Sequence, residues 1–382
     1  MKKQIINANI ILADGILENG VCRFEDGIIE YVGGERIEGI ETISAEGGYL
    51  MAGFIDMHCH GGSGYDFMDA TPAEMIEISK FHLSHGTTTL IPTTMTDVWD
   101  AIYAVLDRYA QLGEQRLTLE GVHLEGPWLN PAQCGAQDTS KMDTPTEEKL
   151  RALLEKYPFI NRISAAPELP CGMEIGRLGA ELGVVMSVGH SDADFDTVVA
   201  AADNGYSLMT HLYSGMSVVH RKNAYRTAGA VEGALYDDRL YVELIADGKH
   251  LPAGLLKLVK KVKGADRVAL ITDAMRGAGL AEGEATVLGR KEDGVACIIE
   301  DGVAKLPDRQ AFAGSVATAD RLLRTMHFEA GATLPECSKM LSATPARIMG
   351  FDDRGSIEAG KRADLVLLDE KLNVIKVLLK GA

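Results

Sequence analysis

The sequence has no closely spaced pair of cysteines. Its six cysteines are scattered over 382 residues and form no C-x-x-C motif. This spacing excludes the usual cysteine zinc site and gives no sign of a disulfide framework, so we expect reduced thiols in a cytoplasmic protein. No apolar run approaches the roughly 20 residues of a membrane span. The short run IINANII, broken by Asn7 and Asn9, makes a poor signal peptide.

Positive charge is also scarce. The chain has 38 lysines and arginines against 55 aspartates and glutamates, for a net charge of −17. We therefore expect neither nucleic acid nor an anionic membrane surface as a partner. A small anion could bind only through locally placed cations. Because 46% of the residues are hydrophobic and 24% are charged, the chain can form a globular protein with a sizeable core.

Strand and helix patterns alternate through the middle of the chain. Eight apolar, β-branched runs are separated by helical stretches such as PAEMIEISKFHLSHG. This alternation predicts a (β/α)8 TIM barrel over 52–351. An open doubly wound sheet is the weaker alternative, because no G-x-G-x-x-G follows the first strand. Short strand patterns with DG and GG turns fill both ends, so we expect 1–51 and 352–382 to form one small β-sandwich domain.

The first predicted barrel strand carries an H-x-H motif in GFIDMHCHG. Alternate side chains share one face of a strand, so we expect His58 and His60 to point the same way as Asp56. Met57 and Cys59 should then point away. Two imidazoles at the mouth of a barrel suit a divalent metal, while two surface histidines are the alternative.

Other metal-binding residue types stand at the ends of later predicted strands. They are Glu125 in HLEGPW, His190 in VGHS, His211 in THLY and Asp273 in TDAM. Barrel enzymes build their active sites from the carboxyl ends of the strands. Burying so many ionisable groups is costly unless they are paired or bind a metal. Together with the H-x-H motif, these residues predict a metal centre.

These motifs resemble those of the amidohydrolase superfamily, and most closely its N-acetylglucosamine-6-phosphate deacetylases. The resemblance covers nearly the whole chain and includes FIDMHCHG, HLEGPWLNP, VGHSDA, THLYSGM, ITDAM and GSIEAGKRADLVLLD. It implies a metal-dependent barrel enzyme of the amidohydrolase type. The implied reaction is removal of the acetyl group from N-acetylglucosamine-6-phosphate, which gives glucosamine-6-phosphate and acetate in amino sugar catabolism.

The resemblance also implies a role for each metal ligand. Glu125, His190 and His211 match the residues that bind the main metal. His58 and His60 match a pair that can hold a second metal, so one or two divalent ions are implied. Zinc is the first expectation, and iron, manganese and cobalt are alternatives that suit the same ligands.

The resemblance makes Asp273 the general acid/base and brings further residues to the sugar. His250 matches a histidine that polarises the acetyl carbonyl or holds the sugar, with a surface histidine as the alternative. The loop residues implied to contact the sugar are Ala136, Gln137, Ser214, Gly215 and Ala313. We expect Asp320, Arg321 and Arg324, which follow in the chain, to lie on a solvated helix face.

The segment SVVHRKNAYRTAGAVEG departs most from the family, whose members have R-E-P-G there. In the family an arginine of this segment and a nearby histidine bind the phosphate, often from a partner subunit. The candidate phosphate ligands here are His220, Arg221, Lys222 and Arg226, and a solvated loop is the alternative. The family is commonly dimeric, so we expect a homodimer.

Three other functions stay open. The substrate could be N-acetylgalactosamine-6-phosphate or another N-acetyl amino sugar. A non-catalytic sugar-phosphate sensor would keep the fold but would not need Asp273. A dihydroorotase-like hydrolase of cyclic amides is disfavoured, because such enzymes often use a carbamylated lysine on strand four and NRISAAPE has none.

Overall fold

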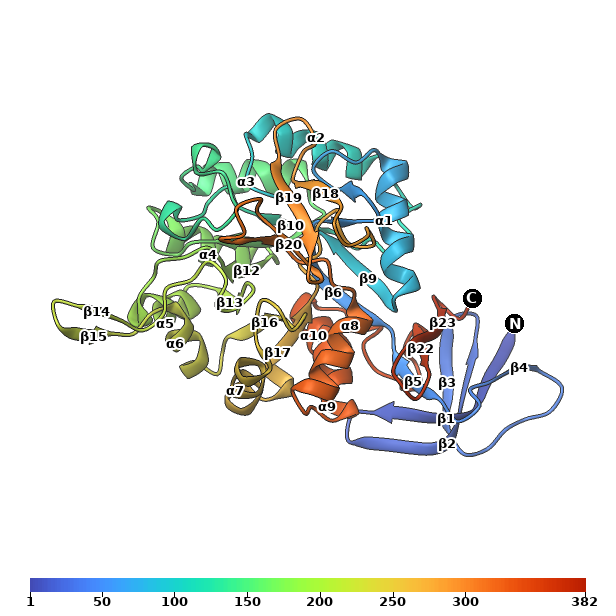
Figure 1. Ribbon diagram of the computed structural model, residues 1–382. Coiled ribbons are helices and arrows are strands. Elements are labelled where there is room, and N and C mark those ends of the chain that lie inside the picture. Colours follow the sequence, from blue (N-terminus) through green and yellow to red (C-terminus); the bar gives the residue numbers. More distant parts are fainter.

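The computed structural model describes all residues from 1 to 382 (Figure 1). The eight predicted runs form parallel strands, which are β6 (Phe54–Cys59), β9 (Thr87–Pro92), β10 (Val122–Glu125), β11 (Ile160–Ala165), β12 (Val185–Val188), β13 (Tyr206–Met209), β16 (Tyr241–Ile245) and β17 (Val268–Ile271). Strands β10, β11, β12, β13, β16 and β17 pair in that order, and β6 pairs with β9. Parallel bridges from Thr93 to His123 and from Cys59 to Ala274 join the two groups. The parallel sheet therefore curls into a barrel, as predicted.

A helix follows each barrel strand and packs on the outside. These helices are α1 (Pro72–Ser84), α2 (Trp99–Ala110), α3 (Glu147–Lys156), α4 (Gly172–Glu181), α5 (Phe195–Asp203), α6 (Ala230–Tyr236), α7 (Ala253–Lys263) and α8 (Ala319–Arg324). Helix α1 shows why they begin where they do. Thr71 and Glu74 form a reciprocal capping box, and Pro72 stands in the first turn, where no backbone N–H is needed. Helices α9 (Leu334–Ser338) and α10 (Thr344–Met349) follow α8.

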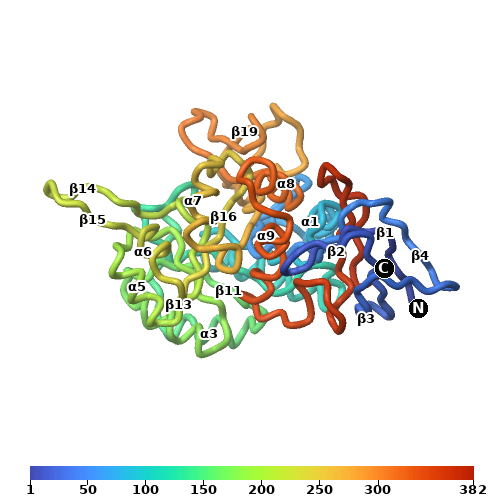
Figure 2. The backbone as a smooth tube through the Cα atoms, turned by 90° about the horizontal axis from the view of Figure 1, so that it is seen from below, coloured from blue at the N-terminus to red at the C-terminus, as the bar shows by residue number.

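Both ends of the chain meet in one seven-stranded sheet beside the barrel (Figure 2). Its strands are β1 (Lys2–Leu12), β2 (Gly15–Glu25), β3 (Ile28–Gly33), β4 (Glu41–Ser44), β5 (Tyr49–Ala52), β22 (Leu365–Leu368) and β23 (Val374–Leu378). β5 pairs with β1 on one side and with β22 on the other. A separate apolar core that includes Ile10, Phe24 and Leu365 stabilises this sheet. The expected joining of the two ends is confirmed, and the sandwich form stays a prediction.

Three smaller elements decorate the barrel. The pair β7 (Gly61–Gly62) and β8 (Tyr65–Asp66) follows β6. The hairpin of β14 (His220–Lys222) and β15 (Tyr225–Thr227) projects from the barrel on the side away from the seven-stranded sheet in both views (Figures 1 and 2). A four-stranded antiparallel sheet is inserted after β17 and comprises β18 (Ala285–Leu288), β19 (Val295–Glu300), β20 (Val303–Lys305) and β21 (Phe312–Gly314). None of the helices is both long and apolar enough for a membrane crossing.

Candidate metal centre and active site

Glu125, at the end of β10, is surrounded by four imidazoles. Its Oε1 lies 2.9 Å from Nε2 of His211, 3.3 Å from Nε2 of His190 and 3.5 Å from Nε2 of His58. Its Oε2 lies 3.3 Å from Nε2 of His60. All five side chains are at least nine-tenths buried. The predicted ligands therefore converge on one point, although they come from four different strand ends.

Asp273 completes the cluster on the side of the two H-x-H imidazoles. Its Oδ1 lies 3.3 Å from Nε2 of His58 and 3.2 Å from Nε2 of His60, and those two nitrogens are 3.2 Å apart. Possible ligand atoms fall into two overlapping groups, one of His58, Glu125 and His211 and one of His58, His60 and Asp273. Imidazole nitrogens crowded around shared carboxylate oxygens suit a divalent transition ion. The residues present therefore fit one or two metals.

Three residues of the cluster have left-handed backbone conformations. The φ angles are 45° at His190, 27° at His211 and 47° at Asp273. Such a conformation costs a non-glycine residue on the order of 1–3 kcal/mol and persists only where surrounding contacts hold it. Each of these residues stands two positions beyond the last residue of a barrel strand. The strained turns therefore stand at the strand ends that carry the cluster.

Burial and neighbouring charges act on the cluster in opposite directions. Burial raises the pKa of Glu125, but the imidazoles outweigh it and hold that pKa well below its usual value. Burial likewise raises the pKa of Asp273, and the histidines bring it down to about 2. Burial lowers the pKa of His58, whereas Asp273 and Glu125 raise it to about 9. In the absence of metal, the carboxylates and the protonated imidazoles thus form ion pairs. Metal binding then displaces the imidazole protons.

Neighbouring groups fix the orientation of the ligands. Gln137 donates from Nε2 to Oε2 of Glu125 over 2.9 Å and accepts at Oε1 from the backbone N–H of Thr96. Nδ1 of His190 donates to the carbonyl of Gln133 over 2.8 Å. The resemblance implied only a contact of Gln137 with the sugar, so its side-chain hydrogen bond to Glu125 was not predicted.

A cavity of about 200 Å³ opens on the cluster. It is lined by every residue predicted to contact the sugar, namely Ala136, Gln137, Ser214, Gly215, His250 and Ala313. Leu288 and Phe312, which come from the inserted sheet, also line the cavity, and the sequence pattern did not mark these two residues. The alternative of a surface His250 is wrong, since its side chain is 9% exposed and its Nδ1 lies 2.7 Å from Oδ2 of Asp247. An adjoining cavity of about 320 Å³ shares Leu288 with the first and adds Lys141 and Arg290.

The predicted phosphate ligands do not reach this cavity within one chain. His220, Arg221, Lys222 and Arg226 lie on the projecting hairpin (Figure 1). All four are exposed, and none lines either cavity. A single chain therefore leaves the basic cluster and the metal cluster apart.

Asp56 does not share a face with His58 and His60, so that prediction is wrong. Its carboxylate accepts from the backbone N–H of Thr272 over 3.2 Å, and it lies close to Cys59 and His82. The pairing of β6 with β9 shifts register between Asp56 and Cys59. This irregularity breaks the alternation that the prediction assumed. Cys59 points away from the cluster as expected, with Sγ 3.2 Å from Nε2 of His82.

The predicted solvated face of Asp320, Arg321 and Arg324 is also wrong. Asp320 is 7% exposed and accepts from Arg324 and from Thr318. Arg321 donates to the carbonyls of Gly302 and Asp247. These side chains tie α8 to neighbouring loops, and Arg321 braces the residue that holds His250.

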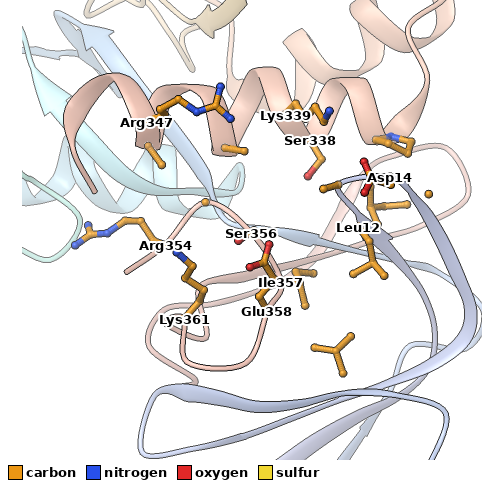
Figure 3. A pocket seen from close by; sticks show the side chains of 18 of the residues that line it. Leu12, Asp14, Ser338, Lys339, Arg347, Arg354, Ser356, Ile357, Glu358 and Lys361 are labelled. Atoms are coloured by element: carbon orange, nitrogen blue, oxygen red, sulfur yellow. The ribbon is translucent and has the colours of Figure 1, made fainter. Parts of the chain in front are cut away.

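A larger cavity lies elsewhere, between the seven-stranded sheet and the helices α9 and α10 (Figure 3). It has a volume of about 930 Å³ and is lined by residues such as Asp14, Lys339, Arg347 and Glu358. No histidine or cysteine lines it. It therefore lacks the ligand chemistry of the smaller cavity, which we take as the active site.

A curled parallel sheet with histidines and carboxylates at its strand ends defines a metal-dependent barrel hydrolase. The model of the amidohydrolase family matches residues 49–382, and the chain belongs to this family. It is 33% identical to an N-acetylglucosamine-6-phosphate deacetylase of Lysinibacillus sphaericus, over 99% of this chain and 96% of that protein. It is 32% identical to an N-acetylgalactosamine-6-phosphate deacetylase of Escherichia coli O157:H7, over 97% of this chain and 96% of that protein.

Solved structures agree with these relatives. An N-acetylglucosamine-6-phosphate deacetylase from Pasteurella multocida is 28% identical and superposes with a TM-score of 0.92, over 100% of this chain and 99% of that one. A mutant of the Mycobacterium smegmatis enzyme, solved in complex with N-acetyl-D-glucosamine-6-phosphate, is 28% identical. It superposes with a TM-score of 0.91 over 100% of this chain and 98% of that one.

Proposed function

We propose that the protein hydrolyses the acetamide of N-acetylglucosamine-6-phosphate to glucosamine-6-phosphate and acetate. The observation that carries this proposal is the position of Asp273 and the imidazoles at the wall of a small, sugar-sized cavity. The names of the relatives and the phosphorylated amino sugar bound in a solved neighbour support the substrate class.

In this proposal Glu125, His190 and His211 hold the main metal, zinc in the first instance, and His58 with His60 holds a second one. The metal, when bound, supplies a Lewis acid and lowers the pKa of a bound water to about 7. Four neutral imidazoles and one carboxylate are a ligand set that zinc, iron, manganese and cobalt all accept.

Asp273 then acts as general base and general acid. Its carboxylate takes a proton from the attacking water and passes it to the amine nitrogen of the leaving sugar. His250 contacts the acetyl carbonyl or the sugar, because Asp247 holds one of its ring nitrogens and leaves the other for substrate. Backbone groups of Ala136, Ser214 and Ala313 surround the sugar.

We propose that the hairpin of a second subunit supplies the phosphate site, so the enzyme is a homodimer. Arg221, Lys222 and Arg226 are exposed on this hairpin, and guanidinium and ammonium groups of this kind bind anions. Lys141 and Arg290 lie nearer to the active site but are each paired with both Asp97 and Asp293. The two carboxylates already neutralise the two cations, which argues against Lys141 and Arg290 as the phosphate ligands.

A second candidate substrate is N-acetylgalactosamine-6-phosphate. The altered hairpin favours it, as does the 32% identity to a deacetylase of that sugar. Rates of acetate release from both 6-phosphates and from unphosphorylated N-acetylglucosamine test the proposal. A kcat/KM that is highest for N-acetylglucosamine-6-phosphate supports it. Equal values with and without phosphate would refute it.

We also propose two domains, with 1–51 and 352–382 forming a small β-sandwich domain and 52–351 forming the catalytic barrel. The separate apolar core of the seven-stranded sheet supports this division. The active-site cavity draws all its lining residues from the barrel segment, so the chemistry belongs to that domain alone.

A further inference from the structure

A buried ion pair inside the barrel has no part in the reaction steps above. Arg162 on β11 donates to Oε1 of Glu243 on β16, and neither side chain is exposed. Arg162 also donates to the carbonyl of Met57 over 2.9 Å. Burying two charges is costly, and hydrophobic residues of similar size often stabilise a protein as well. The pair therefore calls for a role besides stability.

The second oxygen of Glu243 contacts two of the proposed metal ligands. Oε2 lies 3.4 Å from Nδ1 of His58 and accepts from the backbone N–H of His211 over 3.2 Å. A carboxylate only accepts hydrogen bonds, so Nδ1 of His58 must carry the hydrogen. Nε2 of a neutral His58 then has its lone pair free, and this is the nitrogen that faces Glu125 and Asp273. Glu243 thus selects the tautomer that can bind a metal.

The hydrogen bond from the backbone N–H of His211 to Glu243 concerns a proposed ligand of the main metal. His211 has a strained φ of 27°, and its N–H points at Glu243. Arg162 in turn is held by Ser187 and Thr210, which lie 3.5 Å and 3.4 Å from its NH2. A planar guanidinium fixed on several sides holds a carboxylate in one orientation. The pair links His58, from the first barrel strand, to His211, from the sixth.

We propose that Glu243 is a positioning residue of the metal centre, and that Arg162 holds its carboxylate in place. Glu243 fixes the tautomer of His58 and the backbone of His211 without touching metal or substrate. This inference rests on the proposed function only in needing a metal at the cluster. Mutation of a group that hydrogen-bonds to a metal ligand typically lowers metal affinity about 10- to 100-fold.

The test measures zinc affinity by competition with a chromophoric chelator, together with the visible spectrum of the cobalt-substituted protein and the melting temperature. The variants are Glu243→Gln and the double variant Arg162→Met with Glu243→Leu. The double variant leaves no unpaired buried charge, so it should fold even where the single variant does not. Asp364→Asn is the matched control, because Asp364 is 4% exposed and is paired with Arg362 just before β22 of the seven-stranded sheet.

We expect Glu243→Gln and the double variant to bind zinc about 10- to 100-fold more weakly and to change the cobalt spectrum. Asp364→Asn should lower the melting temperature but keep zinc affinity within about two-fold, because distant sites do not couple. A folded double variant with wild-type zinc affinity and an unchanged cobalt spectrum overturns the proposal. Wild-type protein that binds zinc but releases no acetate overturns the proposed function alone, since these measurements need no turnover.

Discussion

Gln137 donates a hydrogen bond from Nε2 to Oε2 of Glu125 over 2.9 Å, and the backbone N–H of Thr96 fixes its amide in that orientation. The loop that lines the sugar cavity is therefore tied directly to the central carboxylate of the metal cluster. We therefore expect a change in this loop to affect metal binding as well as sugar binding.

The first prediction follows from that contact. Gln137→Ala leaves Oε2 of Glu125 without this donor, so metal affinity should fall about 10-fold or more. Gln133→Ala is a control in the same loop, because Gln133 holds His190 through its backbone carbonyl and its side chain reaches only the exposed Asp192. Zinc titration of the two variants checks the prediction. Equal affinities would show that the Gln137 side chain does not support the metal.

The second prediction concerns the proton transfer. Asp273→Asn removes the proposed general base, so kcat should fall by about 10²- to 10⁴-fold. The main metal should remain bound, because Glu125, His190 and His211 are unchanged. Asp192→Asn, at an exposed acid, is the control. Steady-state kinetics with metal analysis decides the matter, and an Asp273→Asn variant with nearly normal kcat would exclude this role.

The cluster was predictable because its residues stand at strand ends, where the fold brings them together whatever the details of packing. The prediction for Asp56 failed because the alternation of residue types gives no sign of a register shift within β6. Arg162 stands within NRISAAPE, but the sequence pattern assigned it no role. Its partner Glu243 lies three barrel strands away, and only the curled sheet brings the two side chains into contact. The proposed role of the hairpin needs a second subunit, which no single sequence describes.

The third prediction is that chelation removes activity and lowers stability together. A metal bound to the folded state alone stabilises it by about 2.7 kcal/mol when its free concentration is 100 times its Kd. Treatment with a chelator should therefore abolish acetate release and lower the melting temperature, and added zinc should restore both. The control is the same protein carried through a mock treatment. Full activity after the last transition metal is gone would refute the metal centre.

The fourth prediction concerns stability and pH. Burial raises the pKa of Asp320, but His85, Thr318 and Arg324 outweigh it and hold the pKa below its ordinary value of 3.8. A lowered folded pKa stabilises the protein above the ordinary pKa, and this contribution is lost as the pH falls below it.

Asp320→Asn should therefore reduce the free energy of unfolding by about 1–3 kcal/mol at pH 7. The difference from wild type should shrink below a pH of about 4. Glu114→Gln is the control, because Glu114 is an exposed carboxylate. Urea unfolding across this pH range measures the difference. A deficit that stays constant down to the lowest pH would show that the charge of Asp320 is not its cause.

The last prediction tests whether the hairpin serves the partner's active site. Replacing Arg221, Lys222 and Arg226 by alanine should raise KM for the phosphorylated sugar about 10-fold or more while leaving the kcat/KM for unphosphorylated N-acetylglucosamine unchanged. The hairpin variant and Asp273→Asn are then unfolded, mixed in equal amounts and refolded. If each hairpin reaches across a symmetric dimer, a mixed dimer has one active site with both defects and one with neither. The mixture should then regain about a quarter of wild-type activity at low substrate, since half of the dimers are mixed. If each hairpin instead folds back onto its own cavity, no site in the mixture is intact and no activity returns.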